Sequence, residues 1–273
     1  IFFQNISIGA KELNNYRNVT LNVSDFARLE TKGYFKYSDF GTITQKFFNS
    51  FVPKNYNVFL NEKSADAGGV TDAEFDFSFV LTDTNNLIAK IVPGLYIAPK
   101  TSVEGSYNYT QSLKLDVVSK LVAYNSMALD KLNISAKERS GIYTLNMKSP
   151  KLYTESSSIL ENINITLNST PMLLQLQLLW NANDNTAKNM GNINIDVTNN
   201  LVSNMINIYN SHFVINGERW NITNNGNIIL FDTNTLQIHN LQFGSNKQSL
   251  TINSDIVKGT KDSLDLIFDN FSL

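Results

Sequence analysis

Apolar and polar residues alternate with a period of two through almost the whole chain. The alternation is plainest at residues 174–178, which read LQLQL, and it returns at 75–79, 193–197 and 264–268. Successive side chains of a β-strand point to opposite faces of a sheet, so each segment is predicted to be a strand with one apolar and one polar face. So many strands of this kind place a large apolar surface on one side of a sheet. What covers that surface is therefore the functional question.

Predicted strands account for most of the chain. The first stretch suggests short strands around 6–8, 19–23 and 33–37. Residues 201–209 fit either a short helix or a strand. The connections are short and rich in Asn and Gly, which favours antiparallel neighbours because parallel pairs need crossovers of about a dozen residues or more. From residue 57 onward the predicted strands lie near 57–61, 73–82, 87–92, 94–98, 102–109, 112–118, 120–124, 127–136, 141–148, 151–154, 158–167, 171–180, 190–198, 211–216, 219–223, 227–231, 235–243, 248–257 and 262–273.

One segment has helical periodicity. Asp39 or Ser38 can cap its first turn with a side-chain oxygen, and Pro53 ends it, so we predict a short amphipathic helix near 39–51. Such a helix usually packs on a sheet or plugs it. An interfacial membrane helix would need a basic polar face, and Lys46 is the only basic residue there. The apolar stripe of the predicted helix consists of Phe40, Ile43, Phe47 and Phe51.

The strand predicted at 235–243 breaks phase. Its apolar set shifts by one residue between Ile238 and Leu241. A β-bulge near residues 239–240 would return both halves to the same face, and a sheet corner is the competing interpretation. Either device bends the sheet.

The polar side of the strands is neutral rather than ionic. Charged residues make up 17% of the chain, below the usual quarter, and Asn and Ser take their place. A formal net charge of -2 gives no reason to expect a nucleic acid or an anionic membrane as a partner. The absence of cysteine excludes thiol catalysis and Cys-ligated zinc.

No constellation of catalytic or metal-binding residues is visible. The two histidines, His212 and His239, have no metal-ligand spacing, and there is no nucleophile elbow, phosphate loop or calcium loop. Asp76, Asp196 and Asp265 alternate with apolar residues, which places them on the polar face, and no two carboxylates are seen to converge as a glycosidase requires. The sequence therefore predicts no catalytic residue, no metal site and no cofactor, and a hydrolase is the least supported class.

Three arrangements could cover the apolar face. A second sheet would give a β-sandwich, closure would give a barrel, and curling would give a trough that holds lipid chains. Strands of similar length without long Greek-key returns favour the trough. So does the strand length, since five to seven residues span roughly 17–23 Å, comparable with one leaflet's share of a hydrocarbon core about 30 Å thick. We divide the chain into residues 1–56, with short strands and the helix, and residues 57–273, one continuous β segment.

The C-terminal part resembles a known family. The segments that carry the resemblance are 212–222, 228–232, 236–243, 248–252 and 264–273, with 103–108, 176–180 and 191–195 fitting as well. In this order they resemble the TamB family, the inner-membrane component of the translocation and assembly module, which is related to AsmA-like proteins. The version in Bacteroidota-type bacteria is the most similar. The resemblance covers about residues 95–273.

The resemblance implies a fold and a role. The fold would be an elongated, curved, mostly antiparallel sheet that forms a U-shaped groove with an apolar interior. The role would be non-enzymatic guidance of phospholipid or other acyl-chain lipid across the periplasm between inner and outer membranes, linked to outer-membrane protein assembly. We expect the inner-membrane anchor, and the part that meets an outer-membrane barrel of the TamA type, to lie outside this chain. A secreted or surface β-sandwich that binds or adheres is the alternative.

The residues predicted to line the groove are the apolar positions of the alternating strands. They are Phe75, Phe77, Phe79, Leu113, Leu115, Val117, Ile163, Ile165, Leu167, Leu174, Leu176, Leu178, Trp180, Ile193, Ile195, Val197, Phe213, Ile215, Ile228, Leu230, Leu236, Ile238, Leu241, Phe243, Leu250, Ile252, Leu264, Leu266 and Phe268.

Overall fold

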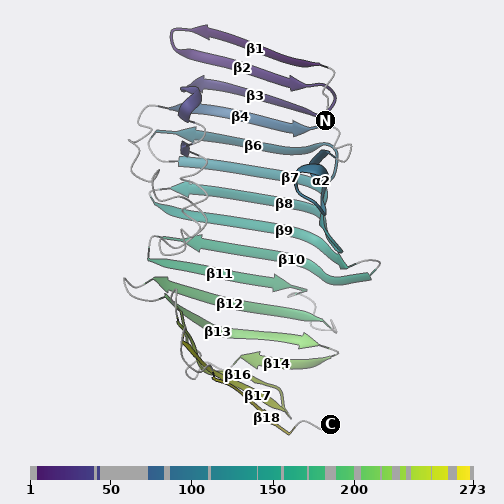
Figure 1. The fold of residues 1–273 in the computed structure, drawn as a ribbon, viewed down its shortest axis with the longest axis vertical. Coiled ribbons are helices and arrows are strands. Elements are labelled where there is room, and N and C mark those ends of the chain that lie inside the picture. The colour runs from purple at the N-terminus through teal and green to yellow at the C-terminus, as the bar shows by residue number, and fades with distance from the viewer. Residues whose placement is uncertain are drawn as a thin grey trace. The chain divides into compact units, whose positions relative to one another are not determined.

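The described part of the chain is almost entirely β-sheet. Its 18 strands form one antiparallel sheet (Figure 1), which confirms the all-β prediction. The chain divides into two compact units, one ending at Ile163 and the other beginning at Asn164. The domain boundary predicted at residue 56 lies outside the described residues. The computed structural model describes residues 5–39, 42–43, 73–82, 87–109, 112–139, 141–154, 157–170, 172–181, 189–199, 204–215, 217–222, 228–231, 235–246, 248–257 and 263–270.

Unit 1 is an antiparallel meander. Consecutive strands pair with one another except around β5, where β4 pairs directly with β6, and β5 pairs with the far half of β7. The strands are β1 (Ile6–Leu13), β2 (Tyr16–Val23), β3 (Ala27–Tyr34), β4 (Glu74–Leu81), β5 (Leu95–Ile97), β6 (Thr101–Asn108), β7 (Ser112–Tyr124), β8 (Met127–Arg139) and β9 (Ile142–Thr154), followed by the first half of β10 (Ser157–Ser169).

Unit 2 continues the same local pattern. Two short strands, β14 and β15, pair with the two ends of β13, and both also pair with β16. The strands after β10 are β11 (Leu173–Trp180), β12 (Met190–Asn199), β13 (Asn204–Ile215), β14 (Glu218–Ile222), β15 (Ile228–Phe231), β16 (Thr235–Gly244), β17 (Ser249–Val257) and β18 (Ser263–Asp269).

The prediction of a strand at residues 87–92 is wrong. This segment is a short helix, α2 (Leu87–Ile91), in which the amide of Val92 donates to the carbonyl of Ile88 at 2.8 Å. Leu, Ala and Lys are strong helix formers, and apolar residues four apart share one helical face. The helix stops before Gly94, whose φ of 83° no β-branched residue adopts comfortably.

The strand predicted at 33–37 is also misplaced. The strand is β3, which begins at Ala27, and residues 37–39 are helical. Its outward positions carry Arg28, Glu30 and Lys32, while its inward side has few large apolar groups, so the alternation is weak. Residues 42–43 are helical too, but the rest of the predicted helix near 39–51, and the strand predicted at 57–61, lie outside the described residues.

Several predicted strand breaks are bends within continuous strands. β7 runs through residue 119, β9 through residues 149–150 and β13 through residue 210. Asn210 has a φ of 45°, and Lys131 and Asn162 show the same left-handed conformation inside β8 and β10. A left-handed residue rotates the strand, so the apolar set changes phase there without the strand ending.

Buried serines stabilise these bends. A bend removes some backbone carbonyls from the hydrogen-bond ladder, and a buried carbonyl without a partner is costly. The hydroxyl of Ser149 lies 2.6 Å from the carbonyl oxygen of Asp130, and that of Ser119 lies 3.0 Å from the carbonyl oxygen of Leu121. Ser211 accepts from the amide of Asn194 at 2.8 Å. These small polar side chains are tolerated on the apolar face because they form hydrogen bonds with backbone groups.

The predicted bulge near residues 239–240 is confirmed. The register of β16 against β17 shifts between Ile238 and Leu241. Asn240 has a φ of 51°, and its amide donates to the side-chain oxygen of Asn253 at 2.7 Å. Both apolar halves of β16 therefore face the same side of the sheet.

Candidate functional site

Cross-strand register places the predicted groove residues of unit 2 on one face. Directly opposed residues in an antiparallel pair share a face. Leu167 of β10 lies opposite Leu176 of β11, which lies opposite Ile195 of β12, and this row reaches Ile208 of β13. The parallel row through Ile165, Leu178 and Ile193 lies one pleat repeat away and faces the same side.

The same face continues beyond β13. Ile206 lies opposite both Val197 and Ile229, and Ile229 lies opposite Ile238. By the same alternation the following predicted residues share this face: Leu174, Trp180, Phe213, Ile215, Leu236, Leu241, Phe243, Leu250, Ile252, Leu264, Leu266 and Phe268.

Two predicted lining residues lie on the other face. Ile228 and Leu230 alternate with Ile229 and Phe231, and it is the latter pair that faces Ile238 and Leu236. All four residues of β15 are apolar, so period alone could not determine which two point inward. The face also includes Ile206 and Ile208, Trp220 and Ile222, which the sequence prediction did not name.

In unit 1 the predicted residues form three rows across β4, β6 and β7. Phe75 lies opposite Tyr107, which lies opposite Leu113. The second row is Phe77, Gly105 and Leu115, and the third is Phe79, Val103 and Val117. The rows extend onto β8 and β9 through residues that the alternation could have identified: Ile134, Ala136, Leu145 and Met147. Ile163 of β10 is buried at the end of this unit.

The apolar face is covered to different degrees along the sheet. In unit 1, Phe75 and Leu113 are buried in a cluster with Phe35 and Ile43. In unit 2 most of the face is half-buried, including Leu176 and Ile195. On β18 it is open to solvent, with Leu264, Leu266 and Phe268 exposed to 61%, 48% and 57%.

Aromatic rings lie over glycines on this face. Trp180 covers Gly191, its directly opposed residue on β12, and a Cβ added at Gly191 would overlap the indole ring. Phe77 covers Gly105 on β6 in the same way. The indole Nε1 donates to the side-chain oxygen of Asn189 at 2.8 Å, which fixes the ring of Trp180. Each glycine therefore provides the space in which a large ring lies close to the sheet backbone.

The opposite face is polar and makes its own hydrogen bonds. In unit 2 the amide of Gln177 donates to the side-chain oxygen of Asn194 at 3.0 Å, and Gln175 donates to Asp196 at 3.3 Å. Asp196 also accepts from the hydroxyl of Tyr209 at 3.1 Å. Since these amides and hydroxyls pair across neighbouring strands, this face suits contact with water.

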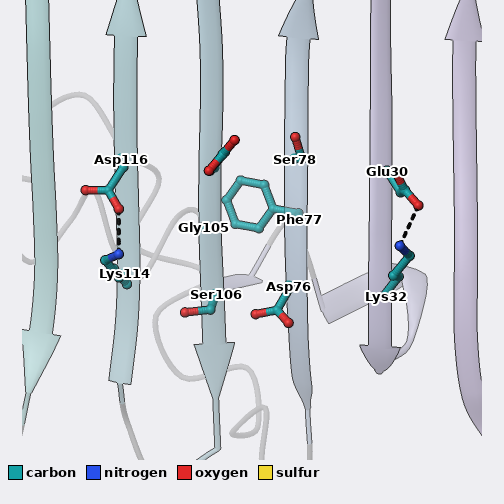
Figure 2. Close-up of a pocket in the computed structure, with 10 residues that line it drawn as sticks. Glu30, Lys32, Asp76, Phe77, Ser78, Gly105, Ser106, Lys114 and Asp116 are labelled. Carbon is teal, nitrogen blue, oxygen red and sulfur yellow. Dashed lines mark ion pairs between the residues drawn. The ribbon is translucent and has the colours of Figure 1, made fainter.

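In unit 1 the polar face carries ion pairs around a shallow hollow (Figure 2). Lys32 pairs with Glu30 at 2.7 Å on one side, and Lys114 pairs with Asp116 at 2.8 Å on the other. Hydrogen bonding to each lysine lowers the pKa of its carboxyl partner. The predicted polar-face position of Asp76 is confirmed, because it lines this hollow together with Glu104, Ser78 and Ser106.

Histidines and carboxylates do not gather into a metal site in the described part of the chain. Burial and the nearby Arg219 guanidinium lower the pKa of His212, which lies on β13, while His239 is exposed at the bulge of β16. None of the helices in the described ranges has the length and apolarity needed to cross a membrane.

Comparison with known proteins finds no similar protein. The chain matches no family model, and no curated protein or solved structure matches it. The resemblance to the TamB family therefore stays a prediction.

Proposed function

We propose that this chain binds the acyl chains of lipids along the apolar face of its sheet and performs no chemical step. The observation that carries the proposal is the row-by-row alignment of apolar side chains on one face, from Leu167 through Leu176 and Ile195 to Ile208, combined with the half-buried state of that face in unit 2. The described strands are connected by hydrogen bonds into a single sheet.

The energetics favour an apolar occupant. Burying one Leu or Ile side chain fully is worth about 1.5–3 kcal/mol, and proteins rarely leave an apolar patch of more than a few hundred Å² in water. Acyl chains need no hydrogen bonds, so they can lie on the face at any position along a row. The self-paired amides of Gln175, Gln177 and Asn194 leave the other face suited to water.

The setting of this activity follows from the TamB resemblance alone. In that setting the chain is one segment of a periplasmic bridge that guides phospholipid between inner and outer membranes, and an outer-membrane barrel of the TamA type is its partner. The alternative, a surface β-sandwich, requires two sheets packed about 10 Å apart.

Site-specific photo-crosslinking tests the proposal. Benzoylphenylalanine is introduced at Leu176 or Ile195 on the apolar face, or at Gln175 on the polar face of the same strand as Leu176, and the protein is irradiated in cells. We expect lipid adducts at the first two positions and none at Gln175, with circular dichroism confirming that each variant is folded. Equal lipid capture on both faces, or capture on neither, would contradict the proposal.

A further inference from the structure

The apolar face of unit 1 is partly occupied by the chain itself. Phe35, which follows β3, packs edge-on against Phe75 with ring centroids 5.5 Å apart. Ile43 is buried in the same cluster, which includes Tyr107, Leu113 and Ala136. We call Phe75, Tyr107 and Leu113, which lie directly opposite one another on β4, β6 and β7, the Phe75 lane. All three are buried.

Arg17 on β2 contacts the start of the segment that carries Phe35 and Ile43. Its guanidinium donates to the carbonyl oxygen of Phe35, is paired with Glu12 at 3.2 Å, and lies 5.7 Å from the ring centroid of Tyr37. The turn that follows is closed by the carboxylate of Asp39, which accepts from the amide of Lys36 at 2.7 Å. Several directional contacts therefore hold residues 35–39 at one fixed place beside the sheet.

The cover does not extend over the whole face of unit 1. Four residues along each strand, beyond the row of Phe77, Gly105 and Leu115, the residues Phe79, Val103 and Val117 form a third row, the Phe79 lane. These side chains are half-buried, as are Leu176 and Ile195 in unit 2. Within the described part of unit 1, the Phe75 lane is thus covered by apolar side chains of this chain, while the side chains of the Phe79 lane keep part of their surface exposed.

We propose that Phe35 and Ile43 act as a resident substitute for an acyl chain, so that lipid in unit 1 is confined to the Phe79 lane unless this segment is displaced. The inference rests on the proposed function, since it specifies where on the apolar face lipid lies. Because the segment and a lipid chain would compete for one surface, the apparent lipid affinity of the Phe75 lane equals its intrinsic affinity multiplied by the fraction of time that the lane is free.

Labelling of the wild-type protein with a phospholipid that carries a diazirine on its acyl chain tests this inference without any substitution. Labelled residues are identified by fragmentation in the mass spectrometer, because the two lanes lie on the same strands, β4, β6 and β7. We expect labels in the Phe79 lane and on β11 and β12. Labelling of the Phe75 lane should be roughly tenfold weaker, because this is the reduction expected if the lane is free in about one molecule in ten. Equal labelling of the two lanes would overturn the inference but leave the proposed function intact. Absence of label from β11 and β12 would instead refute the proposed function.

Variants that loosen the segment provide the second measurement. Arg17→Ala removes its fastening, and Ile43→Ala removes part of its apolar contact; both should raise labelling of the Phe75 lane relative to β11 and β12. Leu13→Ala is the matched control, because Leu13 is an exposed aliphatic side chain on β1 whose register with Tyr16 places it on the opposite face from the cluster. Unchanged labelling in Arg17→Ala and Ile43→Ala proteins that remain folded by circular dichroism would contradict the proposal.

Discussion

Gly191 provides the sharpest test of how the apolar face is built. A Cβ at this position would overlap the indole of Trp180, which is only 9% exposed. Large aromatic side chains bury about 150–250 Å², and at about 25 cal/mol per Å² full expulsion of the ring would cost about 4–6 kcal/mol. Partial movement of the ring, and the gain of about 0.5–1 kcal/mol from replacing a strand glycine by alanine, reduce the expected loss for Gly191→Ala to about 2–4 kcal/mol.

Urea unfolding followed by circular dichroism measures this loss. Gly244→Ala is the matched control, because no atom lies within 4 Å of a Cβ built at Gly244 on β16. We expect Gly244→Ala to be neutral or slightly stabilising. We further expect Trp180→Leu to offset much of the cost of Gly191→Ala in the double variant, since the two positions are coupled. Equal free energies of unfolding for Gly191→Ala and Gly244→Ala would refute the proposed packing.

Three further predictions concern bends and protonation. Ser211→Ala leaves the amide of Asn194 without its acceptor, so the free energy of unfolding in urea should fall by about 1–3 kcal/mol. Asn240→Gly should unfold at nearly the wild-type urea concentration, whereas Asn240→Val should lose about 1–2 kcal/mol, because the φ of 51° is disfavoured for side chains branched at Cβ. The pKa of His212 is lowered in the folded state, so as pH falls through 6.5 the unfolded state binds a proton at His212 before the folded state does. Acidification below that pH should therefore lower the melting temperature of the wild-type protein. The decrease should be smaller in the His212→Asn variant.

The alternation predicted most strands because it reports directly on which side chains are buried. It was reliable where large apolar residues alternate with polar ones, as in β4, β11 and β12. It failed at α2, where Leu, Ala and Lys favour a helix, and in β3, whose inward side includes Thr31 and Gly33. In both cases the local pattern of hydrophobicity does not distinguish the competing structures.

The bends show a second limit of the pattern. A left-handed residue such as Asn210 changes the phase of a strand without ending it, and the sequence then suggests two strands instead of one. In the uniformly apolar β15 no phase is visible, so the pattern gives no basis for choosing Ile228 and Leu230 over Ile229 and Phe231 as the inward residues. The contact of Phe35 with Phe75 could not be predicted, because it joins residues far apart in the chain without a shared period.

Quenching of the native tryptophans by brominated phospholipid tests the central claim most directly. The sequence has two tryptophans, Trp180 and Trp220, and both lie on the apolar face of unit 2, through their register with Gly191 and Phe213. If acyl chains bind this face, phospholipid with bromine on its acyl chains should quench their fluorescence, and unbrominated phospholipid should not. Bound brominated lipid that leaves the fluorescence of both residues unchanged would contradict the account.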